Sequence, residues 1–236
     1  MLWSYFPDGL TNVLDVAPND AYTTAFLRDN PDDTAVGNFL EKELFKVRGN
    51  ASALRKLVAI LKAPRFKDSS AATMASMFDP DRPFATGKPM PEFAFASIPD
   101  QPGTASKTIT TKTMAGQVYL VDIWATWCGP CLASMPRIHE LYGKYSRGKI
   151  GKKLAILSVS LDATADKVVK FRTDKEHPMP WTNALSNEAV LEKLTGGVKS
   201  IPVPTMVLVD DRGVIVGSTP DINDESLPKL LDQLLK

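Results

Sequence analysis

The chain has 236 residues, of which 44% are hydrophobic and 23% are charged, a composition typical of ordinary soluble globular proteins. Its 28 basic and 27 acidic residues leave a formal charge of +1, so no long-range field directs the protein to nucleic acid. No stretch approaches the ~20 consecutive apolar residues that span a bilayer. We therefore expect no nucleic-acid partner and no transmembrane segment.

The start of the chain does not read as a signal peptide. The first residues, MLWSYFPDGL, lack a basic segment followed by an apolar run and a small-residue cleavage site. Two interpretations stay open at this point. The sequence is either that of a cytoplasmic protein or that of the mature form of an exported one.

Residues 1–80 are predicted to form a small helical module. Apolar residues recur at spacings of three and four from Val36 to Val47, and again from Leu54 to Leu61, where Asn50 can cap the helix. Such apolar stripes either form a core or bind a partner. Two shorter helices are predicted over 20–30 and 69–78.

A proline-rich segment follows the helical module. Residues 81–91 belong to the stretch DPDRPFATGKPMP, which cannot hold a regular helix. We interpret 81–91 as a linker. The prolines of this stretch are Pro80, Pro83, Pro89 and Pro91.

Strands and helices alternate in residues 92–236. Val118 to Trp124 (VYLVDIW) and Leu154 to Leu161 (LAILSVSL) are apolar runs typical of strands covered on both faces. The alternation predicts an α/β fold in which helices flank a mixed sheet. Shorter strands are predicted over 93–95, 108–111, 205–209 and 214–217, and helices directly after the cysteines and over 165–175, 188–194 and 224–235.

The chain has only two cysteines, Cys128 and Cys131, within WATWCGPC. Zinc binding needs four ligands, and only His139 and His177 remain as histidine candidates, neither suitably placed. A static disulfide across so short a loop would remove little chain entropy. Redox exchange is the interpretation that the surroundings favour, and we expect neither a metal nor a cofactor.

The segment around the cysteines favours redox exchange for electrostatic reasons. A strand that ends at Trp124 delivers Cys128 to the N-terminal end of a helix, where unpaired N–H groups and the helix dipole stabilise a thiolate. Cys128 is the predicted nucleophile, and Cys131, one turn further on, is predicted to resolve the mixed disulfide. Pro130 is tolerated in a first helical turn, and Gly129 leaves the sulfur approachable.

The segment VDIWATWCGPC resembles the active-site segment of the thioredoxin superfamily, and the longer frame resembles its TlpA/ResA-type branch of envelope thiol-disulfide oxidoreductases. This resemblance implies a thioredoxin-like fold and an enzyme that reduces disulfide-bearing protein substrates and is restored by an upstream dithiol reductant. It also implies the bacterial periplasm or cell envelope. The further matching motifs are GKPMPEFAF at 87–95, Pro136, SLD at 160–162, Trp181 and PTMVLVDDRG at 204–213.

The resemblance also assigns roles to single residues. Asp122 matches the buried carboxylate that shuttles a proton for the resolving cysteine; the alternative is a tolerated or edge-exposed aspartate. Pro204 matches the family's cis-proline, next to backbone that pairs with the substrate; Pro202 is the alternative, but the spacing from VLVD at 207–210 favours Pro204. We expect substrate contacts at Trp127, Gly129, Pro130, Val203 and Pro204.

Two features depart from the TlpA/ResA pattern. Ser134 stands where that branch commonly carries a glutamate, so the acid-base group moves to Asp122 on the strand. The helical residues 1–80 have no counterpart in thioredoxin. Pro136 is expected to kink the helix that follows the cysteines.

Two other functions compete with disulfide reduction. Peroxiredoxins share the fold but need Thr or Ser three residues before the reactive cysteine and Pro seven before it, where this chain has Ala125 and Val121. A scaffold protein is the third interpretation, with the helical module binding a partner. The presence of both cysteines argues against a scaffold that has lost its chemistry.

Overall fold

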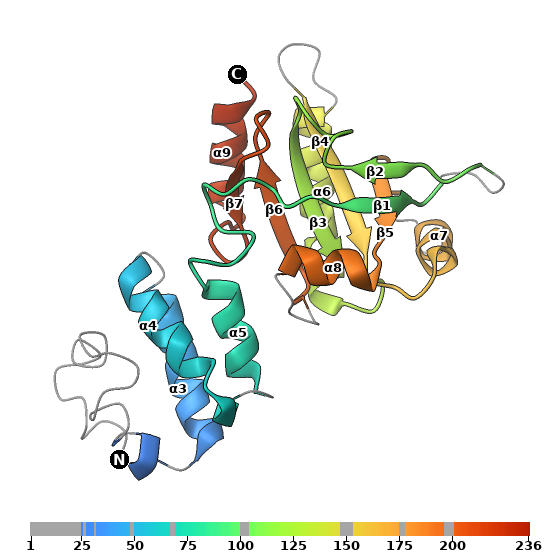
Figure 1. Cartoon of the computed structure of the whole chain (residues 1–236). Helices are drawn as coiled ribbons and strands as arrows, with labels where there is room; N and C mark the ends of the chain where they lie inside the picture. Colours follow the sequence, from blue (N-terminus) through green and yellow to red (C-terminus); the bar gives the residue numbers. More distant parts are fainter. Residues whose placement is uncertain are drawn as a thin grey trace. The chain divides into compact units, whose positions relative to one another are not determined.

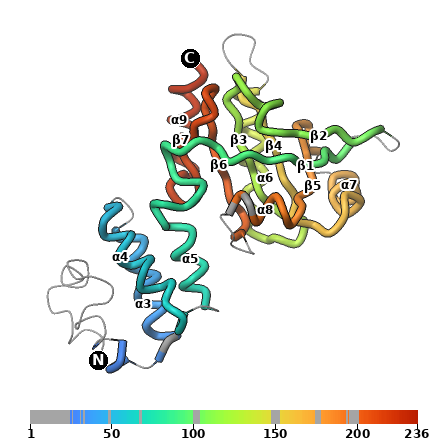
Figure 2. Tube along the Cα trace, viewed as in Figure 1, coloured from blue at the N-terminus to red at the C-terminus, as the bar shows by residue number. Residues whose placement is uncertain are grey.

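The computed structural model describes residues 25, 27–30, 32–47, 50–66, 69–99, 104–146, 153–174, 178–195 and 201–236. The chain divides into two compact units, Met1–Arg82 and Pro83–Lys236, which Figures 1 and 2 colour from blue to red along the sequence. The predicted helix over 20–30 lies largely outside the described residues.

The first unit is helical and has its own apolar core. Each helix begins at a residue whose side chain accepts hydrogen bonds from the first turn, namely Asp32, Asn50 and Ser69. Gly37 lets two helices approach closely, because an added Cβ would lie 3.2 Å from the Ala71 Cβ. The helices are α3 (Asp33–Lys46), α4 (Ala51–Leu61), a 3₁₀ turn at Pro64–Phe66 and α5 (Ser70–Phe78).

The second unit contains one mixed sheet, as predicted. Among the described residues its order is β2-β1-β5-β4-β3-β6-β7. The three central strands β3, β4 and β5 are parallel, and every other neighbouring pair is antiparallel. The strands are β1 (Ala94–Ser97), β2 (Thr108–Thr110), β3 (Val118–Trp124), β4 (Leu154–Ser160), β5 (Thr182–Leu185), β6 (Thr205–Val209) and β7 (Ile215–Ser218).

Helices cover both faces of this sheet (Figure 1). The apolar cluster on one face joins even-numbered residues of β3 and β4 to the helices α6 (Gly129–Leu141), α7 (Ala165–Asp174) and α9 (Ser226–Leu234). The cluster on the other face joins the odd-numbered residues to α8 (Glu188–Thr195) and to the segment that leads into β1. All seven residues of β3 are buried, as the continuous apolar run predicted.

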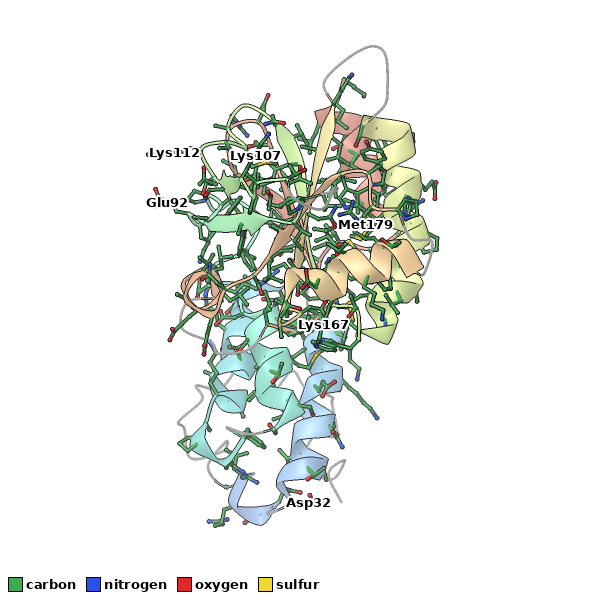
Figure 3. The ribbon with its side chains drawn as sticks, turned by 90° about the vertical axis from the view of Figure 1, so that its right-hand side faces the viewer. Asp32, Glu92, Lys107, Lys112, Lys167 and Met179 are labelled. Carbon is green, nitrogen blue, oxygen red and sulfur yellow. A yellow bond between two sulfur atoms is a disulfide. The ribbon has the colours of Figure 1, made fainter. Side chains whose placement is uncertain are left out.

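Charged side chains flank the edge strand β2. Lys107 and Lys112, labelled in Figure 3 together with Glu92, stand before and after Thr108–Thr110 and are exposed. An exposed strand edge invites pairing with a second chain, and flanking lysines oppose it. Among the described helices none is both long enough and apolar enough to cross a membrane.

The proline-rich segment packs along β7. The Gly87 N–H donates to the Ile215 carbonyl at 2.8 Å, and the Met90 N–H donates to the Gly213 carbonyl at 2.9 Å. The Ser218 hydroxyl donates to the Phe84 carbonyl at 2.6 Å. The segment interpreted as a linker over 81–91 is thus attached to the second unit from Pro83 onward, and the domain division itself stays a prediction.

One strand was missed by the sequence analysis. Strand β5, Thr182–Leu185, has four residues and begins with the polar pair Thr182 and Asn183, so its pattern is too short and too polar to stand out. It completes the sheet by pairing with β4 on one side and β1 on the other. The other predicted strands and helices of residues 92–236 are present, with ends displaced by one or two residues.

Candidate active site

The two cysteines lie where the most buried strand gives way to a helix. Strand β3 ends at Trp124, and Cys128 is the N-cap of α6. Cys128 and Cys131 are joined by a disulfide. The Cys131 N–H donates to Cys128 Sγ at 3.2 Å, so a first-turn N–H of α6 points at this sulfur. Such donors and the helix dipole stabilise negative charge on Cys128 when the bond is reduced.

A buried carboxylate holds the loop between β3 and α6. Asp162, which follows β4, accepts from the Thr126 N–H at 3.0 Å and from the Thr126 hydroxyl at 2.7 Å. It also accepts from the Ser160 hydroxyl at 2.7 Å. Thr126 stands two residues before Cys128, so this network sets the path of the chain into the active site. Asp162 was noted in the sequence only as part of the SLD motif.

The surface around the disulfide is formed by its neighbours. Cys128 is 5% exposed and Cys131 is 2% exposed, whereas Trp127 is 65% exposed. Gly129 and Pro130 form the exposed first turn of α6. The indole of Trp127 is a large apolar surface in water, and aromatic side chains are enriched at protein interfaces relative to the rest of the surface. It stands immediately beside the residue predicted to be the nucleophile.

Asp122 lies on the active-site face of the sheet. Side chains alternate along a strand, and the even-numbered residues Leu120 and Trp124 belong to the same apolar cluster as both cysteines. Asp122 is 1% exposed, which excludes the edge-exposed alternative. Burial raises its pKa to about 7, although a hydrogen bond from Ser158 lowers the pKa in part. The carboxyl group can therefore both accept and return a proton near neutral pH.

Ser158 on β4 and Trp181, the residue before β5, orient the hydrogen bond to Asp122. Ser158 pairs with Asp122 across β4 and β3, and its hydroxyl donates to Asp122 Oδ2 at 2.9 Å. The Trp181 indole N–H donates to the Ser158 oxygen at 2.9 Å. The Ser158 hydroxyl has one proton to donate and can also accept a hydrogen bond. Because its oxygen accepts from Trp181, its proton is directed to Asp122. The sequence analysis gave neither Ser158 nor Trp181 a role.

Aromatic rings fix the position of Trp181. Its ring centroid lies 4.8 Å from that of His139 and 5.4 Å from that of Tyr142, both near the end of α6. Trp181 is 7% exposed. The indole is thus clamped between the helix and the sheet, which keeps its N–H directed at Ser158.

The peptide bond between Val203 and Pro204 is cis, as expected for Pro204 rather than Pro202. Val203 and Pro204 are both half-buried, and Val203 packs against the apolar clusters of both faces. Strand β6 begins at the next residue, Thr205. The contact of these residues with a substrate stays a prediction.

Comparison with known proteins agrees with this geometry. The model of the Redoxin family matches residues 85–234. The chain belongs to the Redoxin family. Residues 1–84 of this Redoxin member lie outside the matched region. Among the described residues, no group of three or more His, Cys, Asp or Glu side chains could hold a metal ion.

Curated relatives of this Redoxin member are named for disulfide chemistry. The thiol-disulfide oxidoreductase ResA of Bacillus cereus is 29% identical over 159 residues, which cover 67% of this chain and 82% of the relative. The thiol:disulfide interchange protein DsbE of Yersinia pestis is 30% identical over 148 residues, or 58% of this chain and 66% of the relative. These matches support membership of the TlpA/ResA-like group of the thioredoxin superfamily.

Solved structures show the same fold. A crystal structure assigned as a DsbE thiol:disulfide interchange protein from Chlorobium tepidum has a TM-score of 0.52 and 26% identity, covering 65% of this chain and 99% of its own. The thioredoxin domain of a thiol-disulfide oxidoreductase from Bacteroides vulgatus has a TM-score of 0.50 and 20% identity, covering 62% and 98%. The predicted thioredoxin-like fold is confirmed.

Proposed function

We propose that this protein is a thiol-disulfide oxidoreductase that reduces disulfide bonds in other proteins. The observation that carries the proposal is the Cys128–Cys131 pair at the first turn of α6, where the Cys131 N–H donates to Cys128 Sγ. The names of the ResA and DsbE relatives support the same class of enzyme. The dithiol supplies the electrons, so the reaction needs no cofactor.

The exchange proceeds in two steps. In the reduced protein, the Cys128 thiolate attacks one sulfur of a substrate disulfide; a Cys128–substrate bond forms, the substrate bond breaks, and the departing sulfur takes a proton. The Cys131 thiolate then attacks Cys128 Sγ, forms the Cys128–Cys131 bond and releases the second substrate thiolate. Two electrons pass from the protein to the substrate, and a separate dithiol reductant returns them.

Asp122 acts as the proton acceptor for Cys131 in this proposal. Its buried position on the active-site face and its pKa of about 7 suit a group that takes the Cys131 proton before the second step. Ser158 and Trp181 position the carboxyl group through the hydrogen bonds described above. They act through Asp122 and are positioning residues.

The substrate contacts of the proposal are those expected from the sequence. Trp127, Gly129 and Pro130 form the exposed surface around the disulfide. Val203 and Pro204 would offer backbone to an extended substrate segment. We also place the protein in the bacterial envelope, on the similarity to the ResA and DsbE proteins alone.

A trapping experiment tests the proposal. With Cys131→Ser the second step is blocked, so the mixed disulfide with Cys128 should accumulate and can be isolated on non-reducing gels and identified by mass spectrometry. The intact protein with dithiothreitol should reduce insulin disulfides, and Cys128→Ser should abolish that activity. The captured proteins also report the compartment.

Three results would contradict the proposal. If neither insulin nor any cellular protein is reduced or trapped, the protein is not a disulfide reductase. If Cys128→Ser performs the biological role unimpaired, the scaffold interpretation takes its place. Rapid stoichiometric consumption of hydrogen peroxide by the reduced protein would instead favour a peroxidase.

A further inference from the structure

A cavity opens beside the active-site tryptophan. Its volume is about 460 Å³, which is large enough to hold any amino-acid side chain. It lies within the second unit, and Trp127, the residue before Cys128, forms part of its wall. The lining consists of Trp127, Leu161, Ser186, Asn187, Glu188, Leu191, Glu192 and Ile201.

The framework of this cavity comes from the carboxyl ends of the three parallel strands. Trp127 follows β3, Leu161 follows β4, and Ser186 follows β5. The Leu161 N–H donates to the Trp124 carbonyl at 2.8 Å, and the Ser186 N–H donates to the Ser160 carbonyl at 2.9 Å. Ligands of open α/β sheets commonly bind at this edge. The cavity therefore has a hydrogen-bonded base, and one of its walls is the residue before the reactive cysteine.

The lining combines apolar surface with acid. Trp127, Leu161, Leu191 and Ile201 contribute the apolar part. Glu188 and Glu192 are exposed and stand four residues apart, so they share one face of α8. Among the residues that the structure describes, none of those lining the cavity is basic.

We propose that this cavity receives a lysine or arginine side chain that lies near the reactive cysteine of the substrate protein. This inference rests on the proposed function and specifies its substrate class. Lysine and arginine carry a long apolar stem and a charged end. The stem fits the tryptophan, leucine and isoleucine surface, and the cation fits Glu188 and Glu192. An acidic side chain at the same place is repelled by both glutamates.

Matched peptides test the charge preference. Three peptides are each closed by one disulfide and differ at one position near the first cysteine, which holds lysine, norleucine or glutamate. Norleucine keeps the apolar stem of lysine without the charge. Reduction by the full-length reduced protein is followed by chromatography of the linear peptide. Each rate is divided by the rate of the same peptide with dithiothreitol, which removes any effect of the charge on the disulfide itself.

The lysine peptide should react about fivefold faster than the norleucine peptide at low salt, and the glutamate peptide should be slowest. The differences should shrink at about 0.5 M salt, where exposed charges are screened. The variant Glu188→Gln/Glu192→Gln should bring the ratio of lysine to norleucine rates close to one. Asp224→Asn/Glu225→Gln removes two charges near the start of α9, none of whose residues is among the described lining of the cavity, and should leave the ratio intact.

The outcomes separate this inference from the proposed function. Failure to reduce any of the three peptides overturns the proposed function and this inference with it. Equal normalised rates for the three peptides at low salt overturn this inference alone. A lysine preference that persists in Glu188→Gln/Glu192→Gln also overturns it.

Discussion

The carboxyl group of Asp122 is buried on the active-site face of the sheet. Its surroundings stabilise the protonated and the ionised form to different extents. Burial disfavours the carboxylate and is the largest influence on its pKa, while the Ser158 hydroxyl favours the carboxylate. Trp181 occupies the serine oxygen and so directs the serine proton to Asp122. The result is an acid that changes its charge near neutral pH.

Replacement of Asp122 by asparagine should remove a pH-dependent loss of stability. Below pH 4 the carboxyl group is neutral in the folded and unfolded states, so wild type and Asp122→Asn should be similarly stable. Between pH 4 and 7 the Asp122 carboxyl group is ionised in the unfolded chain. In the folded chain it stays protonated up to a higher pH, because folding raises its pKa from 3.8 to about 7. Wild type should lose stability relative to the variant by on the order of 4 kcal/mol, measured by urea unfolding at several pH values.

Two serines provide matched controls for that measurement. Ser158→Ala removes the hydrogen bond that lowers the pKa of Asp122, so the relative loss of stability should continue to higher pH. Ser160→Ala removes a buried hydroxyl on the same strand face that donates to Asp162, and the pH range should not move. A pH-independent difference between wild type and Asp122→Asn would contradict the assignment.

At the scale of elements, the loop between β3 and α6 depends on contacts from outside itself. Asp162 lies 36 residues away from Thr126 in sequence and accepts from both its N–H and its hydroxyl. The Leu161 N–H donates to the last carbonyl of β3, at Trp124. The end of β4 thus holds the turn that presents Cys128. We expect the reactivity of Cys128 to depend on this turn, because Cys128 is the N-cap of α6 and its sulfur accepts from the Cys131 N–H.

Substitution of Asp162 by alanine should weaken both the fold and the reaction. The change leaves the Thr126 N–H, the Thr126 hydroxyl and the Ser160 hydroxyl without their acceptor. The free energy of unfolding should fall by about 2 to 4 kcal/mol, and exchange of reduced Cys128 with a small aromatic disulfide should slow. Asp166→Asn, at an exposed carboxylate in the first turn of α7, should change stability by less than about 1 kcal/mol. Unchanged exchange and stability in Asp162→Ala would contradict this role.

At the scale of the whole molecule, each unit has a separate apolar core. The core of the first unit is drawn from residues 36–78, and the two clusters of the second unit are drawn from residues 84–231. Both cysteines, Asp122 and the cavity beside Trp127 lie in the second unit. We propose that the units unfold as separate cooperative transitions.

A core substitution in the first unit tests this separation in the full-length chain. Leu57 is 0% exposed, and Leu57→Ala should lower the free energy of unfolding of the first unit by about 2 to 5 kcal/mol. The rate of insulin reduction under native conditions should stay within about twofold of wild type. Leu208→Ala, at a site that is also 0% exposed but in β6, should lower the stability of the second unit instead. A single transition that moves equally in both variants would refute separate units.

The sequence by itself determined the place of the cysteine pair, the alternation of strands and helices in residues 92–236 and the helical character of residues 33–78. These features depend on local patterns, namely residue spacing and apolar periodicity. The thioredoxin-like fold and the choice of Pro204 came instead from the resemblance of several motifs to the thioredoxin superfamily. Asp122 was assigned by the same resemblance; its burial is confirmed, and its role in proton transfer stays a prediction.

Only the tertiary structure decided which distant side chains meet. Strand β5 depends on its neighbours β4 and β1 for its place, since four residues with a polar start have little strand character alone. The bonds from Trp181 to Ser158 and from Thr126 to Asp162 join residues 23 and 36 positions apart. The cavity beside Trp127 likewise combines the ends of three strands with α8. Such contacts follow from the packing of parallel strands, which no local spacing encodes.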